Sequence, residues 1–294
     1  MIDIVALFCA VDDFCKTKKL IKLTTFKKDG KNRNRNHLMA DSEIITILIL
    51  FHTYQHRNFK HFYIDYVQKH LLHYFPNILS YNRFVEITKT QLVNMCNFLN
   101  SRLEPCTGIS FIDSTKLQVC HRKRISRNKV FKDTGKIGKT TYGWFFGFKL
   151  HLIVNEQGGL VAVKVTPGNI DDKFPVPLMI KKLFGKLFGD KGYISQSLSS
   201  ILLENAIQLI TNVKKNMKNK LMPLVDKILL RKRSIIETIN DQLKNISQID
   251  HTRHRSIYNF MVNIIGGLIA YTFQDKKPSI SGINYENCLA LIPN

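Results

Sequence analysis

Hydrophobic positions recur at helical spacing through the first third of the chain. Apolar side chains stand three or four positions apart over residues 2–14, and the spacing returns at 44–56 and at 83–99. Asp41-Ser42-Glu43 is a suitable N-cap for the second of these helices. The stretch 16–37 is polar and basic and is predicted to be a loop. We therefore expect residues 1–105 to form an all-helical N-terminal region.

The pattern changes after Pro105 and Gly108, where strand-like and helix-like segments begin to alternate. Apolar and β-branched runs predict strands at 109–114, 142–155, 160–166, 186–190 and 206–211. Helical spacing predicts helices at 174–184, 195–205, 226–249 and 257–273, of which the third is long and amphipathic. This order predicts a mixed α/β domain over residues 106–275, followed by a C-terminal tail over 276–294.

The charge of the chain is strongly positive, with 22 Asp and Glu against 44 Lys and Arg and a formal net charge of +22. Clustered positive charge suits a polyanionic partner such as DNA, although a merely soluble basic protein stays open. The apolar runs are shorter than a membrane span, the first turns carry acidic residues, and the cysteines lack zinc-site spacing. We expect a cytoplasmic protein that does not contact a membrane.

Three acidic residues stand out in this basic chain. Asp113 follows the apolar run 109–112, Asp190 follows Leu187-Phe188-Gly189, and Glu237 lies on the helix predicted at 226–249. Ligands gather at the carboxyl ends of parallel strands, and carboxylates on rigid elements can hold the two Mg²⁺ ions of a phosphoryl-transfer site. An Asp after a strand is also typical of a turn or a helix cap, so that alternative stays open for both.

Glu237 shares its helix face with basic residues. At 100° per residue, Arg233, Glu237 and Lys244 fall within about 40° of one another, beside the apolar stripe of the helix. The arrangement fits a site residue flanked by cations, and it equally fits an ordinary charge ladder on a solvated helix.

Other charged residues are candidates around the carboxylates. Asp171 and Asp172 compete for a carboxylate role, but they precede a helix pattern, which favours capping. Lys149 and Lys191 are candidate phosphate contacts, with a solvated lysine as the alternative for each.

Runs of basic residues flank the proposed carboxylates in sequence. The segment 121–139 is predicted to be a flexible basic loop, and further runs lie at 214–220 and 231–233 and near residue 253. Since these runs flank the proposed carboxylates, contact with the DNA backbone is favoured over a solvated face. The residues expected to bind DNA in these runs are Arg122, Lys123, Arg124, Arg127, Arg233, Arg253 and Arg255.

Taken in order, the motifs FIDST, WFFGFKLHL, GNIDD, GDKGY and R-x-x-x-E-x-x-x-x-x-x-K resemble the DDE transposases of bacterial insertion sequences. The segments CHRKR, KLFGDKGYIS and LLRKRSIIETINDQLKNISQIDHTRHRS look most like insertion-sequence family 982. The resemblance covers about residues 105–275. One departure is visible, because related insertion sequences carry a Tyr three residues before the motif Arg and this chain has Leu230.

The resemblance implies a ribonuclease H-like catalytic fold in which Asp113, Asp190 and Glu237 are the metal-binding catalytic residues. Arg233 and Lys244 match the basic residues of the glutamate motif. It also implies that two Mg²⁺ or Mn²⁺ ions are bound. The expected reaction is cleavage of double-stranded DNA at the element's terminal inverted repeats. Transfer of the freed strand into target DNA would follow, with a homodimer on DNA as the active form. DNA-end binding is expected of the helical N-terminal region.

Two alternatives remain at this stage. A structure-specific nuclease of the same fold would cut DNA without joining it. A non-catalytic DNA-binding protein would bind DNA and give no metal-dependent product. A glycosidase with paired carboxylates is disfavoured, because a charge of +22 has no role with neutral sugars.

Overall fold

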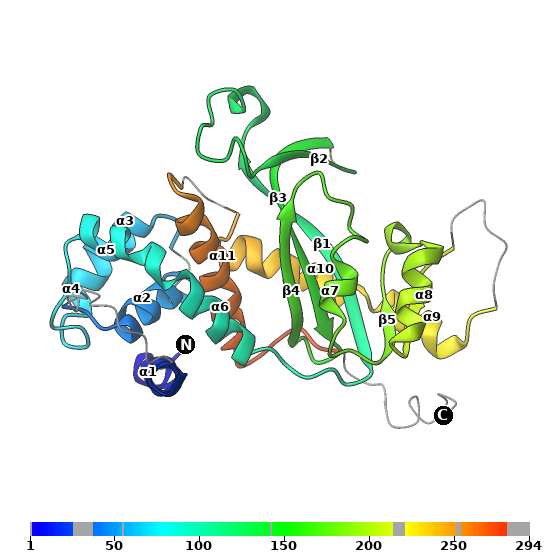
Figure 1. Ribbon diagram of the computed structural model, residues 1–294, viewed down its shortest axis with the longest axis horizontal. Coiled ribbons are helices and arrows are strands. Elements are labelled where there is room, and N and C mark those ends of the chain that lie inside the picture. Colours follow the sequence, from blue (N-terminus) through cyan, green and yellow to red (C-terminus); the bar gives the residue numbers. More distant parts are fainter. Residues whose placement is uncertain are drawn as a thin grey trace. The chain divides into compact units, whose positions relative to one another are not determined.

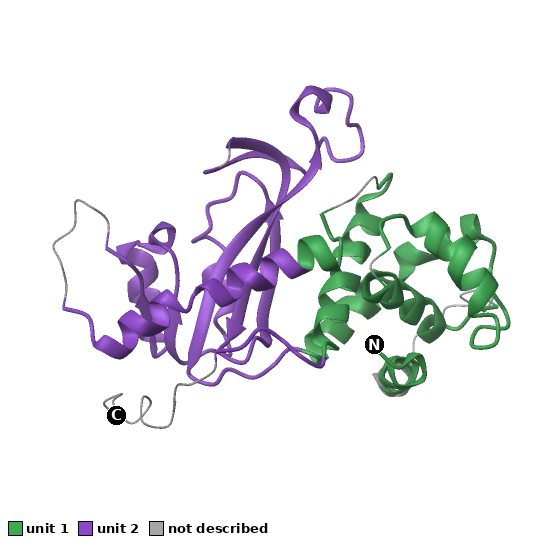
Figure 2. Ribbon diagram, turned by 180° about the vertical axis from the view of Figure 1, so that it is seen from behind, with its two compact units in different colours: residues 1–102, 243–274 green, residues 103–242, 275–294 purple. Residues whose placement is uncertain are grey.

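The chain is described by a computed structural model that covers residues 2–25, 38–54, 56–141, 143–213, 221–250 and 254–280. It divides into two compact units (Figure 2). Unit 1 comprises Met1–Arg102 and Leu243–Gln274, and unit 2 comprises Leu103–Gln242 and Asp275–Asn294. Each unit is described separately below.

The described elements of unit 1 are helical (Figure 1), and none of the described helices is long and apolar enough to cross a membrane. They are α1 (Ile4–Thr25), α2 (Asp41–Thr53), α3 (Phe59–His61), the π-helix η1 (Phe62–Val67), α4 (Gln68–His70), α5 (Tyr81–Thr88), the 3₁₀ helix η2 (Lys89–Gln91), α6 (Leu92–Ser101), most of the π-helix η5 (Gln242–Ile246) and α11 (Ile257–Thr272).

The apolar helix α2 lies in the core of unit 1, with its residues from Ile44 to His52 buried. Its N-cap is Ala40, so the cap expected at 41–43 is wrong by one to three residues. Glu43 nevertheless contributes to the helix start, because its carboxylate accepts a hydrogen bond of 2.6 Å from the backbone N–H of Ala40. Charge in the first turn therefore supports the helix even though the cap itself has no polar side chain.

Aromatic side chains order the segment between α2 and α5, where the spacing predicted no element. Asn58 caps α3 by accepting hydrogen bonds from the backbone of Lys60 and His61. Phe59 stacks on Phe84 with 5.7 Å between ring centroids, and Tyr63 is fully buried. The π-helical turns of η1 do not follow the α-helical period, which is why a search for that period missed them.

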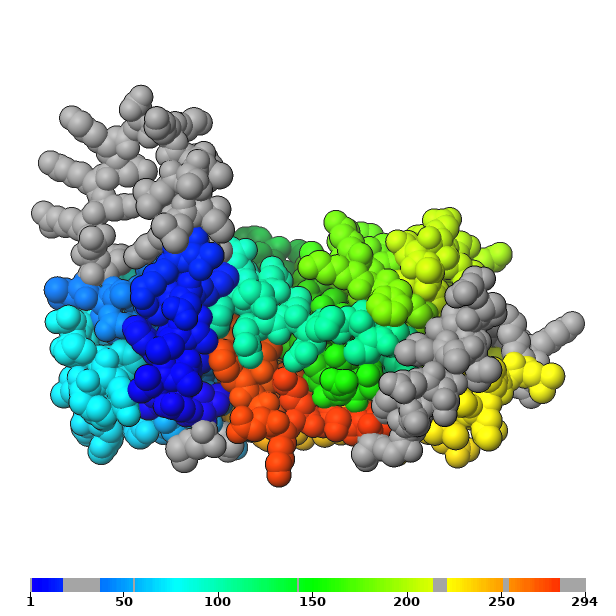
Figure 3. Space-filling model, turned by 90° about the horizontal axis from the view of Figure 1, so that it is seen from below, coloured from blue at the N-terminus to red at the C-terminus, as the bar shows by residue number. Residues whose placement is uncertain are grey.

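The last apolar helix, α11, packs against α2 and α6. The sequence had assigned this helix to the domain that begins at residue 106, whereas it clusters here with the N-terminal helices. Gly266 brings α11 close to α2, because a Cβ at this position would lie 3.0 Å from Cδ2 of the buried His52. The space-filling view shows residues of α1, in blue, on the surface of the unit (Figure 3).

Unit 2 is a mixed α/β structure. Its strands are β1 (Ile109–Cys120), β2 (Lys136–Thr140), β3 (Gly143–Asn155), β4 (Leu160–Pro167), β5 (Gly185–Phe188) and β6 (Ile207–Ile210). Its helices are the 3₁₀ helices η3 (Arg122–Arg124) and η4 (Lys191–Tyr193), together with α7 (Val176–Met179), α8 (Gln196–Glu204), α9 (Leu224–Arg231) and α10 (Ser234–Asp241).

The six strands form one sheet in the order β2-β3-β1-β5-β6, with β4 also paired to β3. β3 is antiparallel to β1, β2 and β4, whereas β5 is parallel to both β1 and β6. One half of the sheet is therefore built from antiparallel neighbours and the other half from parallel ones. Two expected elements differ in length by several residues, apart from the helix predicted at 226–249: β1 extends to Cys120, and α7 is a single short turn.

The basic segment after β1 is more ordered than the flexible loop that was predicted. Arg122–Arg124 form η3, which His121 caps through Nδ1, and Lys136–Thr140 pair with β3 as strand β2. Gly138 in β2 approaches Gly168 at the end of β4 so closely that a Cβ would lie 2.1 Å from the Gly168 carbonyl oxygen. The glycine thus allows the ends of two strands to meet on the same side of β3.

Helices cover the sheet of unit 2 on different faces. Ile112, Ile153 and Leu187 point into a core with the residues of α7 and α8, including Val176 and Leu202. Since side chains alternate along a strand, Phe111 and Phe188 point to the opposite face, where their rings stack at 5.4 Å. α10 contacts β1, and Figure 1 shows it crossing the sheet.

The long helix predicted at 226–249 is three consecutive pieces. α9 ends at Arg231, α10 begins at Ser234, and η5 continues from Gln242 with π-helical turns. Asp226 ties α9 to the sheet through a buried ion pair of 2.7 Å with Lys186 of β5. The break between α9 and α10 allows α9 to bind β5 through Asp226 while α10 contacts β1.

Replacing Gly138 by Ala should lower the free energy of unfolding by about 1–3 kcal/mol, because the added methyl group would overlap the Gly168 carbonyl, which is backbone. Urea unfolding measures the change. Gly192→Ala is the matched control, since its added methyl group would meet no described atom within 4 Å. Equal stability of the Gly138 variant and the native chain would contradict the close approach of β2 and β4.

Candidate active site

The register of β1 and β5 brings Asp113 and Asp190 to the same edge of the sheet. Phe111 pairs with Phe188, and each aspartate lies two residues further along its strand direction. Gly189 points to the face of Ile112, because a Cβ there would lie 3.0 Å from Ile112 Cγ2. Alternation then directs Asp190 to the face that carries Phe111 and Asp113. Asp113 lies within β1, two residues beyond the last residue of β1 that pairs with β5. The sequence predicted it near the end of a strand instead.

The helix α10 presents three polar side chains toward Asp113. Arg233, Glu237 and Asn240 are four and three residues apart, and so they share one helix face. Arg233 donates a 2.6 Å hydrogen bond to Glu237 Oε1 and lies 3.8 Å from Asp113 Oδ1. Asn240 Nδ2 donates to Asp113 Oδ2 at 3.0 Å. Asp113 and Glu237 are thus linked through the face of a single helix.

Burial makes Asp113 a weak acid for its type. Desolvation raises the pKa of Asp113 to about 6, against the guanidinium of Arg233 and the backbone N–H of Ser114, which both lower it. The negative charges of Glu237 and Asp172 raise it further. The neighbouring Arg233 and the Ser114 N–H thus do not offset the cost of burying the charge of Asp113. A further cation beside this carboxylate would stabilise its ionised form.

A second ion pair lies near the same edge of the sheet. Lys149 Nζ donates to Asp172 Oδ1 and to the carbonyl oxygen of Ile170, each at 2.9 Å. Its side chain is 12% exposed, so Lys149 is not the solvated lysine considered as the alternative. Asp171 accepts a local hydrogen bond from the backbone of Lys173, as a capping residue does, whereas Asp172 pairs with Lys149 instead of capping.

Sequence reasoning missed several polar groups around the carboxylates. The Tyr193 side chain is buried, and burial together with the charges of Asp113 and Asp172 raises the pKa of its hydroxyl well above the ordinary range. His151 is buried beside Thr166, with 2.8 Å between Nε2 and Oγ1, and desolvation lowers its pKa to about 4. Asn240 could have been found from the sequence, since its spacing from Arg233 and Glu237 places it on the same face of the helix.

The cations predicted to contact DNA lie partly in unit 2, partly in unit 1 and partly outside the described residues. Arg122, Lys123, Arg124 and Arg127 are exposed in and after η3, and Lys191 is exposed in η4 beside Asp190. Lys244 lies in η5 and Arg255 is exposed before α11, both within unit 1. Arg253 and the basic run 214–220 lie outside the described residues.

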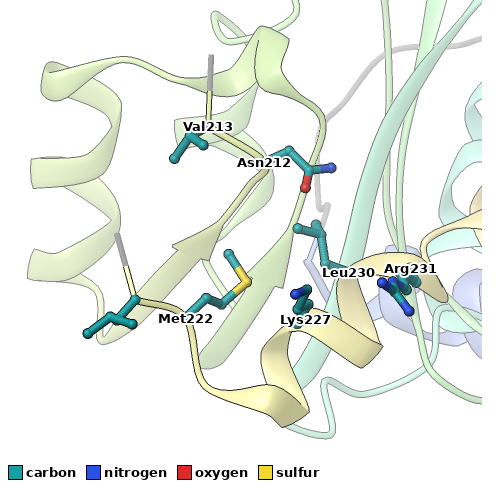
Figure 4. A pocket seen from close by; sticks show the side chains of 7 residues that line it. Asn212, Val213, Met222, Lys227, Leu230 and Arg231 are labelled. Atoms are coloured by element: carbon teal, nitrogen blue, oxygen red, sulfur yellow. The ribbon is translucent and has the colours of Figure 1, made fainter. Parts of the chain in front are cut away.

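A pocket of about 690 Å³ opens beside the end of β6 (Figure 4). Asn212 lies two residues beyond Ile210, which pairs with Phe188, so the pocket lies at the sheet edge that carries Asp190. Figure 4 shows Asn212 on one side and Lys227, Leu230 and Arg231 of α9 on the other. Leu230, the residue found in place of the motif Tyr, is part of this lining.

The donor atoms at the site are suited to a hard divalent cation, because Asp113, Asp190 and Glu237 all offer carboxylate oxygens. Over the part of the chain that is described, however, no three His, Cys, Asp or Glu side chains are close enough together to hold a metal ion. A cationic guanidinium, that of Arg233, lies between two of these carboxylates. Their chemistry therefore fits a cation at this position.

Comparison with known proteins identifies the family. A model described as the transposase DDE domain matches residues 103–257, more than half of the 294-residue chain. The chain belongs to this DDE transposase family. The family implies an enzyme that acts on DNA and depends on divalent metal ions, and the matched range contains the three carboxylates. No curated protein matches the chain.

The pKa of Asp113 predicts how a variant responds to pH. Because this pKa is raised above the ordinary 3.8, the folded chain loses stability as pH rises from about 4 through 6. Asp113→Asn removes this loss, and in EDTA it should be more stable than the native chain at pH 8 by about 1–3 kcal/mol. The difference should vanish at pH 4, which chemical unfolding at both pH values measures. A variant less stable than the native chain at pH 8 would contradict the burial of an ionised Asp113.

Proposed function

We propose that this protein is the transposase of a bacterial insertion sequence, of the family 982 type, which cleaves DNA at the element's ends and joins those ends to target DNA. The observation that carries the proposal is the set of carboxylates in β1, just after β5 and on α10, next to the point where the parallel pairing of β1 and β5 ends. A ribonuclease H-like fold is proposed for unit 2. Its support is the passage from antiparallel β4-β3-β1 to parallel β5 and β6.

In this proposal Asp113, Asp190 and Glu237 hold Mg²⁺ or Mn²⁺, two ions in all. When bound, such ions supply activation of the attacking oxygen and stabilisation of the leaving oxygen at phosphorus. The chain itself positions the ligands. Asn240 holds Oδ2 of Asp113, and Oδ1 faces Arg233, which also binds Glu237. The backbone N–H of Tyr193 donates to the carbonyl oxygen of Asp190 at 3.0 Å, which closes the turn that begins at Asp190.

Cleavage and joining are both in-line displacements at phosphorus, so a single carboxylate site serves both steps. The substrate is double-stranded DNA, first the terminal inverted repeats and then the target. Two element ends must be joined together, which suggests a homodimer on DNA. Recognition of the ends is proposed for the helical unit 1. The protein would act in the bacterial cytoplasm, at the nucleoid.

Contacts to the DNA backbone are proposed for the exposed cations of unit 2. Arg122, Lys123, Arg124 and Arg127 lie in a segment that is held at both ends by the sheet, through β1 and β2. Such phosphate contacts would orient the duplex without reading its sequence. Lys191 is exposed next to Asp190, where it would contact phosphate close to the reacting group. Contacts are also proposed for Lys149, Lys244, Arg253 and Arg255.

Glu237→Gln tests the carboxylate site directly. The substitution keeps the size of the side chain and removes its charge, so metal-dependent nicking of DNA that carries the element's terminal repeats should fall by about 100-fold or more. The assay compares the native protein with the variant, each in Mg²⁺ and in EDTA. Glu204→Gln, which alters an exposed glutamate on α8, is the control and should cleave normally.

The outcomes of this assay distinguish the transposase from the two alternative functions. Nicking that survives in Glu237→Gln would refute the assignment of this glutamate. DNA binding without cleavage in any divalent metal would favour the non-catalytic DNA-binding protein. Cleavage without joined products, assayed with a supercoiled target, would favour the structure-specific nuclease.

Neutralising the basic segment should weaken DNA binding for all sequences. With Arg122, Lys123 and Arg124 all changed to Gln, the slope of log affinity against log salt should fall in magnitude by about 2.7, since each lost phosphate contact contributes about 0.9. Fluorescence anisotropy at several salt concentrations measures the slope. Lys181→Gln with Lys182→Gln is the control, because these exposed lysines precede the amino end of β5. An unchanged slope in the triple variant would remove η3 from the interface.

A further inference from the structure

Arg233 lies between the two carboxylates that the proposed function assigns to metal binding. One terminal guanidinium nitrogen is 2.6 Å from Glu237 Oε1, and the other is 3.8 Å from Asp113 Oδ1. The side chains of Arg233 and Asp113 are 21% and 23% exposed, so solvent screens the interaction with Asp113 only in part. The arginine therefore neutralises charges that would otherwise repel each other on one face of the site.

The other oxygen of Asp113 is already engaged. Asn240 donates to Oδ2 at 3.0 Å and is 7% exposed, so this oxygen faces the protein. Oδ1 is then the oxygen that Asp113 can offer to an added cation, and it is the oxygen that faces Arg233. A divalent ion shared by Asp113 and Glu237 would need the position where the guanidinium lies. Two cations cannot occupy it together.

We propose that Arg233 is the resident counter-ion of Asp113 and Glu237, that a divalent metal ion displaces it, and that the displaced guanidinium then binds a phosphate of the DNA. This inference rests on the proposed function, because it takes both carboxylates as metal ligands. It makes Arg233 a positioning residue that couples occupancy of the metal site to binding of the substrate.

The location of Arg233 suits such a movement. It is the N-cap residue of α10, at the break after α9, so its side chain is not confined within a helix interior. Arg231 and Lys232, which precede it, are exposed. A guanidinium that leaves the carboxylates would join these cations, and its planar set of donors matches the oxygens of a phosphate group.

The exchange makes metal and DNA binding mutually favourable. Without metal, Arg233 is held by Asp113 and Glu237 and is withheld from phosphate. With metal bound, the same side chain becomes a phosphate ligand. By thermodynamic linkage, metal raises the affinity for DNA by the same factor as DNA raises the affinity for metal.

The first test measures Mn²⁺ binding to the full chain without DNA, by isothermal titration calorimetry. Arg233→Gln removes the competing cation and should bind Mn²⁺ about 3- to 10-fold more tightly than the native chain. Arg231→Gln loses the same charge at an exposed neighbouring position and should change the affinity less. Arg233→Lys, whose single ammonium group cannot place a nitrogen on each carboxylate, should lie between the native chain and Arg233→Gln.

The outcomes separate this inference from the proposed function. If Glu237→Gln abolishes Mn²⁺ binding but Arg233→Gln and Arg233→Lys bind Mn²⁺ no more tightly than Arg231→Gln, the metal site stands and the counter-ion role is overturned. If Glu237→Gln binds Mn²⁺ as the native chain does, the metal site and this inference both fail. Thermal unfolding in EDTA identifies a variant that fails to fold, and Arg233→Lys then provides the comparison.

The second test measures DNA affinity against salt concentration, using a duplex without element ends, in Mn²⁺ and in EDTA. In Mn²⁺, Arg233→Gln should reduce the slope of log affinity against log salt by about 0.9, the value of one phosphate contact. In EDTA it should leave the slope unchanged, because Arg233 is then held by the carboxylates. An equal reduction in both conditions would make Arg233 an ordinary phosphate contact and overturn the exchange.

Discussion

The parallel pairing of β1 with β5 is the constraint on which the arrangement of carboxylates depends. It ends at the pair Phe111 and Phe188, whose rings stack on one face of the sheet. Two residues further on, β1 carries Asp113 and the extended segment after β5 carries Asp190, and the alternation of side chains directs both to the stacked face. A shift of one residue in this register would send one aspartate to the other face. The aromatic pair and the buried Ile112 on the opposite face both oppose such a shift.

The proposed site is acidic, whereas the chain as a whole is strongly basic. A net charge of +22 favours a polyanionic partner such as DNA, yet the proposed site is built from carboxylates, one of which has its pKa raised to about 6 by burial. Negative charge at this point would repel the phosphate backbone. Cations beside the carboxylates resolve the conflict, whether they belong to the chain or are taken from solution. In the structure that cation is Arg233, and the family implies a divalent metal.

The sequence predicted the α/β alternation of unit 2 because apolar runs and turn residues report local structure well. It was less informative where tertiary contacts decide the local conformation. β1 runs beyond residue 114 because it pairs along β3 as far as Cys120, a contact that no local pattern encodes. The predicted helix at 226–249 is broken at residues 232–233 and ends in π-helical turns, so Lys244 does not follow the α-helical phase assumed for it. The pairing of Arg233 with Glu237, which lies within α10 and its cap, follows that phase and was predictable.

The same distinction explains why Asn240 was missed. Its helical phase was available, but its role depends on a hydrogen bond to a residue 127 positions earlier in the chain. That bond links α10 to β1 at the one oxygen of Asp113 that is turned toward the protein. Arg233, Glu237 and Asn240 therefore act as one unit, since the position of α10 on the sheet sets all three at once. The spacing of a short motif is informative because about two turns of helix carry a carboxylate, its counter-ion and the group that orients the second carboxylate. A substitution that tilts α10 would disturb all three contacts together, even if it left each of these residues unchanged.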